Sequence, residues 1–370
     1  MNTAPKVLFY VQHLLGVGHL ARASRIAAAL MDDGFAPTIV MGGFPVAGFP
    51  RAGIPVIALP PIKSADAAFS ALVDGEGRSI DGAFKDMRRK TLLDTFAHVD
   101  PDILIIEAFP FGRRQMRFEL LPLLDAAKAA GTRLIVSSVR DILQENRKAG
   151  RDAETLDTIK RYFDIVMVHG DPGFARLEDT FPPARSIAER VFYTGLVADG
   201  APEPSPERYD VVVSAGGGSV GERLIGCALE AAELHSARWC IIGAAKDRAN
   251  SLPPGVELHS FRPDFPSLLA SAGVSVSQAG YNTVCDILAA GAWPVLVPFA
   301  AGGETEQTER ASRLAARACA TMIAEADLTP ERFVDAIRSA PSSRQHGLDL
   351  DGARGTARLL REQLAIRRGR

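Results

Sequence analysis

Residues 12–20, with the sequence QHLLGVGHL, combine two glycines with a histidine in a spacing that suits acid–base chemistry. Gly16 and Gly18 permit a tight turn, because glycine adopts backbone conformations that other residues avoid. His19 is expected to open the following helix, where free N–H groups and a positive partial charge lower the pKa of an imidazole. A neutral His19 could act as a general base, or it could simply hydrogen-bond to a neighbouring loop.

A second glycine-rich segment, residues 214–222 (SAGGGSVGE), lies at an expected strand-to-helix turn. Its bare backbone N–H groups could approach a phosphate closely and hold it. Gly216, Gly218 and Gly221 also match the GxGxxG pattern of dinucleotide-binding proteins. That pattern requires an acid at the end of the next strand, but the first acid is Asp247, beyond the strand. A phosphate cradle is therefore favoured over a nicotinamide or flavin site.

A third segment, residues 275–290 (SVSQAGYNTVCDILAA), predicts a strand, a turn at Gly280 and then a helix. Asn282 and Asp286 are four residues apart on that helix and share one face, with Thr283 beside them. The Asp286 carboxylate could accept two hydrogen bonds from the hydroxyls of a ribose. The alternative is an ordinary acidic residue that complements the helix dipole.

The loop after the strand expected at 293–297 is polar and rich in glycine. It carries Glu304, Glu306 and Gln307, whose side chains suit hydrogen bonding to a polyhydroxylated ligand. Ligands of parallel α/β sheets bind beyond the carboxyl ends of the strands, where this loop would lie. A solvated surface loop is the alternative.

Two acidic residues of the N-terminal half also stand where strands are expected to end. Glu107 follows the strand at 103–106, and Asp141 follows the strand at 133–137. Because both would lie at the ligand-binding edge of a parallel sheet, they are candidate bases together with His19.

A basic cluster with interleaved phenylalanines follows Glu107. It contains Arg113, Arg114 and Arg117, and Arg140 stands in the next expected loop. The cluster could meet an anionic or lipid-linked acceptor, or an anionic membrane surface. Ordinary salt bridges at the start of a helix are the alternative.

These loops must be positioned by regular elements. Short β-branched runs alternate with segments of helical periodicity, which predicts an α/β fold with doubly wound parallel sheets. The alternation restarts near residue 210, after a proline-rich stretch at residues 198–208 that predicts a linker. We expect domains at residues 1–197 and 209–340, followed by a C-terminal helix in residues 341–370.

The composition is that of an ordinary globular protein, with 47% hydrophobic residues, 23% charged residues and a net charge of −2. This balance gives no whole-chain bias toward nucleic acid. The four cysteines form no CxxC pair, so buried thiols are expected and a zinc site or disulfide framework is not. The N-terminus lacks the layout of a signal peptide, and no apolar run is long enough to cross a membrane. We therefore expect a cytoplasmic protein.

The segment SQAGYNTVCDILAAGAWPVLVPF, followed by EQTERA, resembles the donor-binding region of the family 28 glycosyltransferases. This family includes enzymes that make lipid II and monogalactosyldiacylglycerol. The resemblance implies a GT-B fold, in which two Rossmann-like domains face a cleft and a C-terminal helix crosses back to the first. It also implies an inverting, metal-independent transfer from a nucleoside-diphosphate sugar, most readily a UDP-sugar.

The resemblance also implies roles for individual residues. Residues 217–219 would contact the diphosphate, and Asp286 would bind the ribose where the family usually has Glu. Phe261 and Arg262 would surround the nucleobase. Gln307 would contact the sugar hydroxyls, and Glu306 stands beside it where the family often has a second glutamine. The whole set implied for donor binding is Gly16, Gly18, Gly217, Gly218, Ser219, Phe261, Arg262, Gly280, Asn282, Thr283, Asp286, Glu306 and Gln307.

His19 matches the histidine of the family's N-terminal glycine loop, although Leu15 and Val17 replace small residues there. The departure suggests a different acceptor or a shifted loop. The expected partners are a nucleotide sugar and a hydroxyl acceptor bound near Arg113, Arg114 and Arg140, with peripheral membrane contact and a role in cell-envelope or glycolipid synthesis. No cofactor, metal or nucleic acid is expected. The alternatives are a sugar-nucleotide epimerase or hydrolase, a nicotinamide-dependent oxidoreductase and a non-catalytic binding module.

Overall fold

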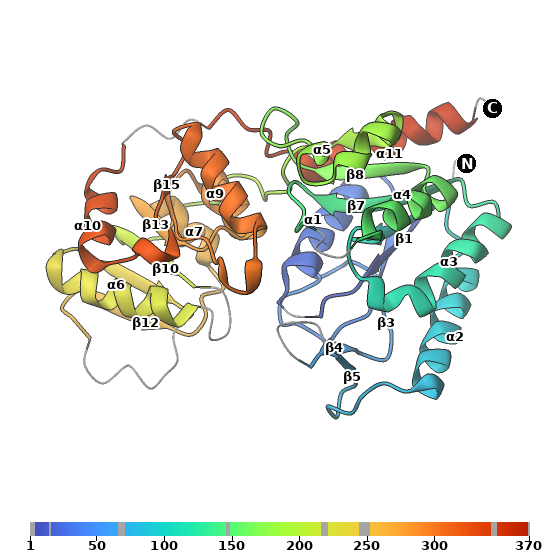
Figure 1. The fold of residues 1–370 in the computed structure, drawn as a ribbon, viewed down its shortest axis with the longest axis horizontal. Helices are drawn as coiled ribbons and strands as arrows, with labels where there is room; N and C mark the ends of the chain where they lie inside the picture. The colour runs from blue at the N-terminus through green and yellow to red at the C-terminus, as the bar shows by residue number, and fades with distance from the viewer. Residues whose placement is uncertain are drawn as a thin grey trace. The chain divides into compact units, whose positions relative to one another are not determined.

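The computed structural model describes residues 4–14, 16–65, 71–145, 149–215, 221–243, 252–341 and 346–368. The chain forms two compact units. The first contains residues 1–197 together with 351–370, and the second contains residues 198–350. Figure 1 shows the first unit in blue and green with the red C-terminal helix, and the second in yellow and orange.

The first unit is built on a seven-stranded sheet in the order β3-β2-β1-β6-β7-β8-β9, in which all neighbouring strands are parallel. Its strands are β1 (Lys6–Val11), β2 (Ala36–Met41), β3 (Val56–Ala58), β6 (Ile103–Glu107), β7 (Leu134–Arg140), β8 (Ile165–His169) and β9 (Val191–Tyr193). A separate antiparallel pair is formed by β4 (Lys63–Ser64) and β5 (Leu72–Val73).

The central strands of this sheet are almost wholly apolar because helices cover both of their faces. The sequence KVLFYV forms β1, and every residue of β6 is buried. The chain passes from β1 outward through β2 and β3 and then returns to place β6 on the other side of β1. The strand order therefore reverses between β1 and β6, which is where ligands bind in open α/β sheets.

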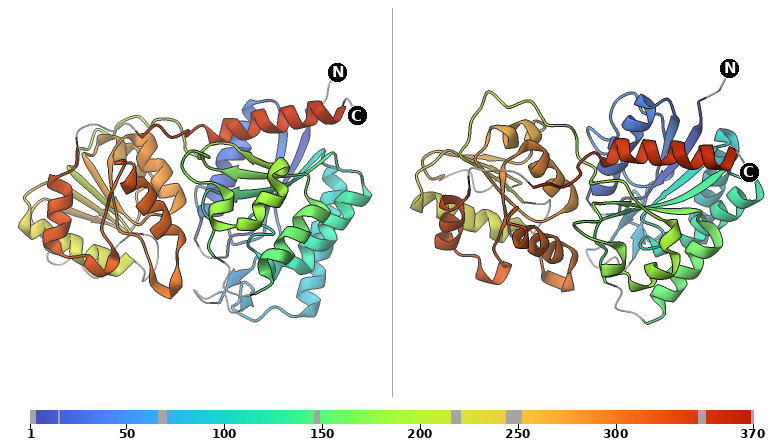
Figure 2. Two further views of the ribbon diagram at one scale, coloured as in Figure 1. Left: turned by 45° about the horizontal axis from the view of Figure 1, so that its top comes forward. Right: turned by 90° about the horizontal axis from the view of Figure 1, so that it is seen from above.

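The helices of the first unit are α1 (Gly18–Asp32), α2 (Gly82–Val99), α3 (Arg117–Ala129), α4 (Arg151–Tyr162), the short α5 (Leu177–Thr180) and α11 (Gly352–Arg368). Helix α11 packs beside α1 (Figures 1 and 2), although the whole second unit separates them in the sequence. Arg361 of α11 fixes this packing by donating to Asp33 Oδ2 from Nε at 2.9 Å and from Nη2 at 2.7 Å. The expected return of the C-terminal helix to the first domain is confirmed.

The second unit has a six-stranded parallel sheet in the order β12-β11-β10-β13-β14-β15. Its strands are β10 (Val211–Ser214), β11 (Trp239–Ile242), β12 (Val256–His259), β13 (Val274–Ser277), β14 (Trp293–Leu296) and β15 (Thr321–Met322). Its helices are α6 (Glu222–Leu234), α7 (Phe265–Ser271), α8 (Tyr281–Ala290), α9 (Glu306–Ala316) and α10 (Pro330–Arg338). Helices α6 and α10 pack together, as do α7 and α8, and the order reverses between β10 and β13.

The expected α/β class with doubly wound parallel sheets is therefore confirmed. The stretch at 198–208, expected to be a linker, lies within the second unit, and so do residues 341–350. The C-terminal helix begins at Gly352 and not near residue 341, because residues 346–350 are not helical. The four cysteines are buried thiols. In the part of the chain that the structure describes, no helix is long and apolar enough to span a bilayer.

Candidate active site

The reversal of strand order in the first sheet brings His19 and Glu107 together. His19 lies in the first turn of α1, and Glu107 is the last residue of β6. The His19 Nδ1 atom is 3.0 Å from Glu107 Oε1. Arg22, one turn further along α1, donates from Nη2 to the same oxygen. A histidine, a carboxylate and a guanidinium thus form one compact cluster at the ligand-binding edge of the sheet.

The exposure of the two side chains distinguishes their roles. The Glu107 side chain is fully buried, whereas that of His19 is 18% exposed. Burial opposes the ionisation of Glu107, but the Arg22 charge and the His19 hydrogen bond outweigh it and hold the pKa of Glu107 well below its usual value. Glu107 is therefore ionised and inaccessible, so it can orient His19 but cannot take a proton from a substrate.

His19 has the properties of a base. Burial, followed by the charge of Arg113, lowers the pKa of His19 to about 3, so the ring is neutral at physiological pH. Two groups contact His19 Nδ1: the Glu107 carboxylate, which only accepts, at 3.0 Å, and Arg22 Nη2, which only donates, at 3.5 Å. The shorter contact favours the tautomer in which Nδ1 carries the proton and donates it to Glu107. The lone pair then resides on Nε2, to which no residue in the described part of the chain hydrogen-bonds.

Asp141, the third candidate base, is buried in the turn after β7. Its Oδ1 accepts the backbone N–H of Ile142 at 2.8 Å. A Cβ at Gly170 would lie 2.9 Å from the Asp141 Cβ, so the two backbones approach closely here. Asp141 thus packs between the residues that follow β7 and β8. Of the three candidates, His19 alone combines exposure with a partner that fixes its proton.

The basic cluster expected to bind the acceptor divides into two parts. Arg114 and Arg117 both pair with Glu154 of α4. Arg114 also donates to the carbonyl oxygen of Arg151 at 2.6 Å. These contacts brace α3 and its preceding turn against α4. Arg114 therefore stabilises the contact between α3 and α4, and its side chain does not extend into an open site.

Arg113 turns away from that packing because its backbone has a φ of +58°, in the left-handed region. Its Nε donates to the carbonyl oxygen of Gln12 at 2.7 Å, which places the guanidinium beside the loop after β1. Burial, followed by the charge of Arg140, lowers the pKa of Arg113 to about 10. Among the described residues, Arg113 forms no ion pair. Arg113 and Arg140 therefore concentrate positive charge near His19.

A buried network of hydrogen bonds and one ion pair holds the loop that leads to His19. Arg88 is fully buried, pairs with Glu119 at 2.7 Å and donates from Nη2 to Gln12 Oε1 at 2.6 Å. The Gln12 amide nitrogen donates in turn to the His13 carbonyl oxygen at 2.9 Å. The carbonyl oxygen of Gln12 receives Arg113, so this network fixes the position of Arg113 as well.

Some of the donor residues expected in the second unit follow β13, which borders the point where its strand order reverses. Gly217, Gly218 and Ser219 fall outside the described residues. Gly280 is the N-cap of α8, and Asn282 and Thr283 stand in its first turn. The N-terminus of a helix carries backbone N–H groups and a positive partial charge that suit the binding of an anion. Asp286 is half-buried one turn further along.

The two residues expected to contact a sugar differ in their surroundings. Glu306 is buried and accepts from Arg310 Nη2 at 2.9 Å, while Arg310 Nη1 donates to the Ala279 carbonyl oxygen at 2.9 Å. This pair ties α9 to the residue that precedes Gly280. Gln307 is half-buried, and its Oε1 accepts the backbone N–H of Phe299 at 3.2 Å. Among the residues that the structure describes, none hydrogen-bonds to the Gln307 amide nitrogen, which could therefore donate to a ligand.

The loop after β12 presents an aromatic ring. Phe261 is 71% exposed, an unusual position for a large apolar side chain that is suited to stacking on a nucleobase. Arg262 instead pairs with Asp264 at 2.7 Å and with Glu207 at 2.9 Å. The hydrogen bond that Arg262 donates to Asp264 is the main cause that raises the pKa of Arg262. Arg262 therefore fastens the loop to the start of the second unit.

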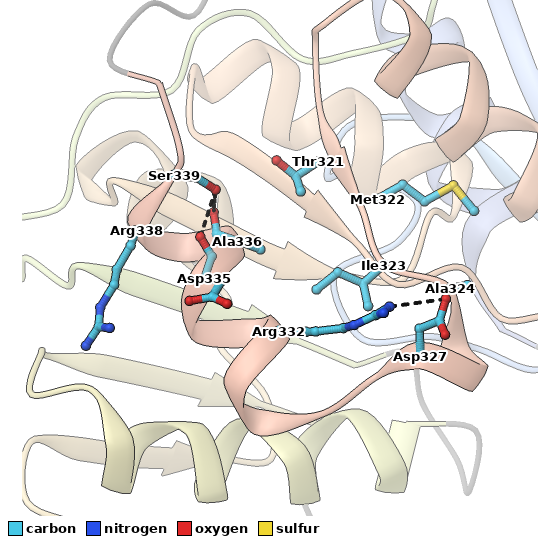
Figure 3. Close-up of a pocket in the computed structure, with 10 residues that line it drawn as sticks. All are labelled: Thr321, Met322, Ile323, Ala324, Asp327, Arg332, Asp335, Ala336, Arg338 and Ser339. Atoms are coloured by element: carbon cyan, nitrogen blue, oxygen red, sulfur yellow. Dashed lines mark hydrogen bonds and ion pairs between the residues drawn. The ribbon is translucent and has the colours of Figure 1, made fainter.

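A hollow of about 610 Å³ lies elsewhere on the second unit, between β15 and α10 (Figure 3). Arg332 and Asp327 form an ion pair of 3.3 Å at one end of it. None of the residues expected to bind a ligand lines this hollow. It is a surface depression at the edge strand of the sheet.

Three residues of the first site were not expected from the sequence: Arg22, Ser138 and His169. Arg22 is three residues after His19, a spacing that places the two on one face of a helix. Ser138 and His169 are polar residues near the carboxyl ends of β7 and β8, so the rule that singled out Glu107 could also have singled out these two.

Comparisons with known proteins agree with this geometry. Residues 212–350 match the model of the glycosyltransferase family 28 C-terminal domain. A UDP-N-acetylglucosamine--N-acetylmuramyl-(pentapeptide) pyrophosphoryl-undecaprenol N-acetylglucosamine transferase of Exiguobacterium sp. is 34% identical over 100 residues, which are 27% of this chain and 28% of that protein. The chain matches less than half the length of the curated relatives of this kind.

Solved glycosyltransferase structures share the fold of the whole chain. The glycosyltransferase VinC, solved in complex with dTDP, has a TM-score of 0.63 at 16% identity, with 97% of this chain and 95% of that chain covered. MurG of Acinetobacter baumannii has a TM-score of 0.59 at 14% identity, with 97% and 100% covered. The resemblance to family 28 is confirmed for the second unit, and the GT-B fold is confirmed for the chain.

Proposed function

We propose, from the premise that residues 212–350 match the glycosyltransferase family 28 C-terminal domain, that this chain transfers a sugar from a nucleoside-diphosphate sugar to a hydroxyl acceptor. The observation that carries the proposal is the pair of His19 and Glu107, joined at 3.0 Å at the ligand-binding edge of the first sheet. A donor-binding domain alone fits a hydrolase or an epimerase equally well. A neutral histidine with a fixed tautomer supplies the base that an acceptor hydroxyl needs.

In the proposed reaction, His19 Nε2 removes the proton of the acceptor hydroxyl as its oxygen attacks the anomeric carbon. The bond from that carbon to the diphosphate breaks, and attack from the opposite face inverts the configuration. The N–H groups at the start of α8 would stabilise the charge on the departing diphosphate. Glu107 stabilises the imidazolium that forms on His19. This sequence of steps uses no metal and no cofactor, as expected from the resemblance to family 28.

The donor is proposed to be a UDP-sugar. The support is the activity for which the curated relatives are named, since they are UDP-N-acetylglucosamine transferases, while VinC was solved with dTDP. Gln307 is positioned to donate to a sugar hydroxyl, and the exposed ring of Phe261 is suited to the nucleobase. These two residues are the ones on which the choice of donor would depend.

The acceptor is proposed to carry a negative group close to its reactive hydroxyl. Arg113 lies near His19 without an ion-pair partner among the described residues, and Arg140 is close enough to lower its pKa. A phosphate or carboxylate would satisfy this charge. The curated relatives are named for a pyrophosphoryl-undecaprenol acceptor, which has this chemistry, so we also propose a lipid-linked acceptor at an anionic membrane surface.

The function is tested by incubating the protein with UDP-, dTDP- and GDP-sugars, with and without hydroxyl acceptors, and measuring nucleoside-diphosphate release. A nucleotide at 100 times its dissociation constant should stabilise the protein by about 2.7 kcal/mol, which a thermal-shift assay identifies beforehand. His19→Gln should reduce acceptor-dependent release by about 10²- to 10⁴-fold. His98→Gln, at an exposed position on α2, is the matched control. Release that needs no acceptor would instead identify a hydrolase, and conversion of the donor into an epimeric nucleotide sugar without release would identify an epimerase.

A further inference from the structure

A row of buried polar side chains continues from Glu107 away from His19. Ser138 Oγ lies 2.6 Å from Glu107 Oε2, and His169 Nε2 lies 2.9 Å from Ser138 Oγ. Thr194 Oγ1 lies 2.8 Å from His169 Nδ1. All four residues are at most 4% exposed. The row is therefore almost wholly shielded from solvent.

The row passes from one strand of the sheet to the next. Glu107 of β6 is in register with Ser138 of β7, and His169 ends β8 two residues beyond the partner of Ser138. Thr194 directly follows β9. The four residues therefore stand on successive neighbouring strands, which hold them at fixed separations.

The direction of every proton in the row follows from Glu107. Its carboxylate only accepts, so Ser138 donates to it and must in turn accept from His169 Nε2–H. His169 is neutral, since burial followed by the charge of Arg22 lowers its pKa to about 3. Its Nδ1 is therefore an acceptor, and the Thr194 hydroxyl donates to it. The row contains no mismatched donor or acceptor.

The far end of the row is held by the C-terminal helix. A Cβ at Gly355 would lie 2.0 Å from the Thr194 carbonyl oxygen, and one at Gly352 would lie 2.2 Å from the Gly195 carbonyl oxygen. Glycine at both positions allows α11 to pack directly on the backbone of residues 194 and 195. Thr194 is thus fixed on one side by β9 and on the other by α11.

The row fixes both oxygens of Glu107. Oε1 receives His19 and Arg22, and Oε2 receives Ser138, so the carboxylate cannot rotate without breaking a buried hydrogen bond. Leaving a buried polar group without a hydrogen-bond partner is costly enough to change the preferred orientation of a side chain.

We propose that Ser138, His169 and Thr194 are positioning residues that hold Glu107 and thereby keep His19 in the tautomer with its proton on Nδ1. The inference rests on the proposed function for its catalytic meaning, because it assigns His19 as the base. The tautomer itself can be measured without any turnover.

The test compares two substitutions of one residue. His169→Gln places an amide N–H near the position of the histidine Nε2–H and should preserve the bond to Ser138. His169→Met removes that donor at similar volume. Protein labelled with ¹⁵N in its seven histidines would be studied by NMR, with the ring signals of His19 assigned through the His19→Gln variant. Ser138→Ala and Thr194→Val each delete one hydroxyl and extend the series. They provide the same test if His169→Met does not fold.

In the wild type, we expect His19 to show a protonated Nδ1 and an unprotonated Nε2. His169→Met should shift part of the population to the other tautomer and reduce kcat by about 10- to 100-fold at little change in the donor KM, while His169→Gln restores both. Unchanged His19 signals in folded His169→Met, or in Ser138→Ala and Thr194→Val, would overturn the inference. Failure of the wild type to turn over any nucleotide sugar would instead overturn the proposed function and leave the tautomer result standing.

Discussion

The pair of Arg22 and Glu107 offers a quantitative test of how the first site is built. Arg22 is 2% exposed and donates to a carboxylate that is itself fully buried. Glu107→Gln keeps the size of the side chain but removes the negative charge. The buried guanidinium then loses this carboxylate, and His19 loses the acceptor that fixes its proton.

The expected cost follows from the burial of both groups. Removing one partner of a buried ion pair destabilises a protein by about 3–5 kcal/mol, because a charge is left uncompensated. The second substitution, Arg22→Met, should cost a similar amount when made alone, since it leaves the carboxylate buried. The double variant has neither charge and should be more stable than either single variant. The coupling between the two positions should therefore reach several kcal/mol.

Activity should behave differently from stability. The double variant still lacks the carboxylate that selects the His19 tautomer, and loss of that selection in a related catalytic arrangement lowers kcat by about 10⁴-fold. We therefore expect stability to return in the double variant while turnover does not. Chemical denaturation, followed by circular dichroism, gives the stability, and nucleoside-diphosphate release gives the turnover.

Two results would refute this reasoning. Additive destabilisation in the double variant would mean that the ion pair does not hold the two positions together. Wild-type turnover in Glu107→Gln would mean that His19 does not need the carboxylate. A substitution at a surface pair, Lys90→Met on α2, is the matched control, because Lys90 pairs with Asp94 in an exposed setting and such pairs contribute about 0–1 kcal/mol.

Acidification should destabilise the first unit, because the pKa values of His19 and His169 are both lowered to about 3 while the unfolded chain takes up these protons near pH 6.5. Between those values the unfolded state binds up to two more protons, so stability should fall by as much as about 2.7 kcal/mol per pH unit as the pH decreases. Denaturation curves from pH 7 to pH 4 measure this, and a flat profile would contradict it. Arg113→Met should raise the KM for an anionic acceptor by about tenfold or more at an unchanged donor KM, whereas Arg114→Met should lower stability and spare acceptor affinity. Equal effects of the two substitutions on acceptor KM, from initial rates, would show that the division of the basic cluster is wrong.

Much of the fold follows directly from local patterns in the sequence. The apolar run KVLFYV and the run ending at Glu107 could only be central strands of a covered sheet, and the alternation with helices fixed the class. The rule that ligands bind at the carboxyl ends of parallel strands then selected His19 and Glu107. It could not reveal that they touch, because their contact depends on the reversal of strand order after β3.

The roles that sequence could not assign depend on burial and backbone conformation. Arg113 and Arg114 are adjacent in sequence, but the left-handed φ of Arg113 directs the two side chains to different neighbours. A non-glycine residue gives no sequence signal of such a conformation. Glu306 is different, because Arg310 follows it by four residues on a helix, and this spacing does indicate the ion pair that buries it.

The charges around His19 give a physical reason to connect the base with the acceptor. In the resting site, the carboxylate of Glu107 is matched by the guanidinium of Arg22, so the cluster of these three residues is neutral. When His19 takes a proton, the cluster becomes positive beside Arg113, whose charge already lowers the pKa of the imidazole. A negative group on the acceptor would offset that charge at the moment of proton transfer, and a neutral acceptor would not. The anionic group should therefore raise kcat as well as affinity, because its interaction is stronger in the transition state than in the ground state. A neutral acceptor analogue that matched the anionic one in kcat, and differed only in KM, would separate the Arg113 charge from the action of the base.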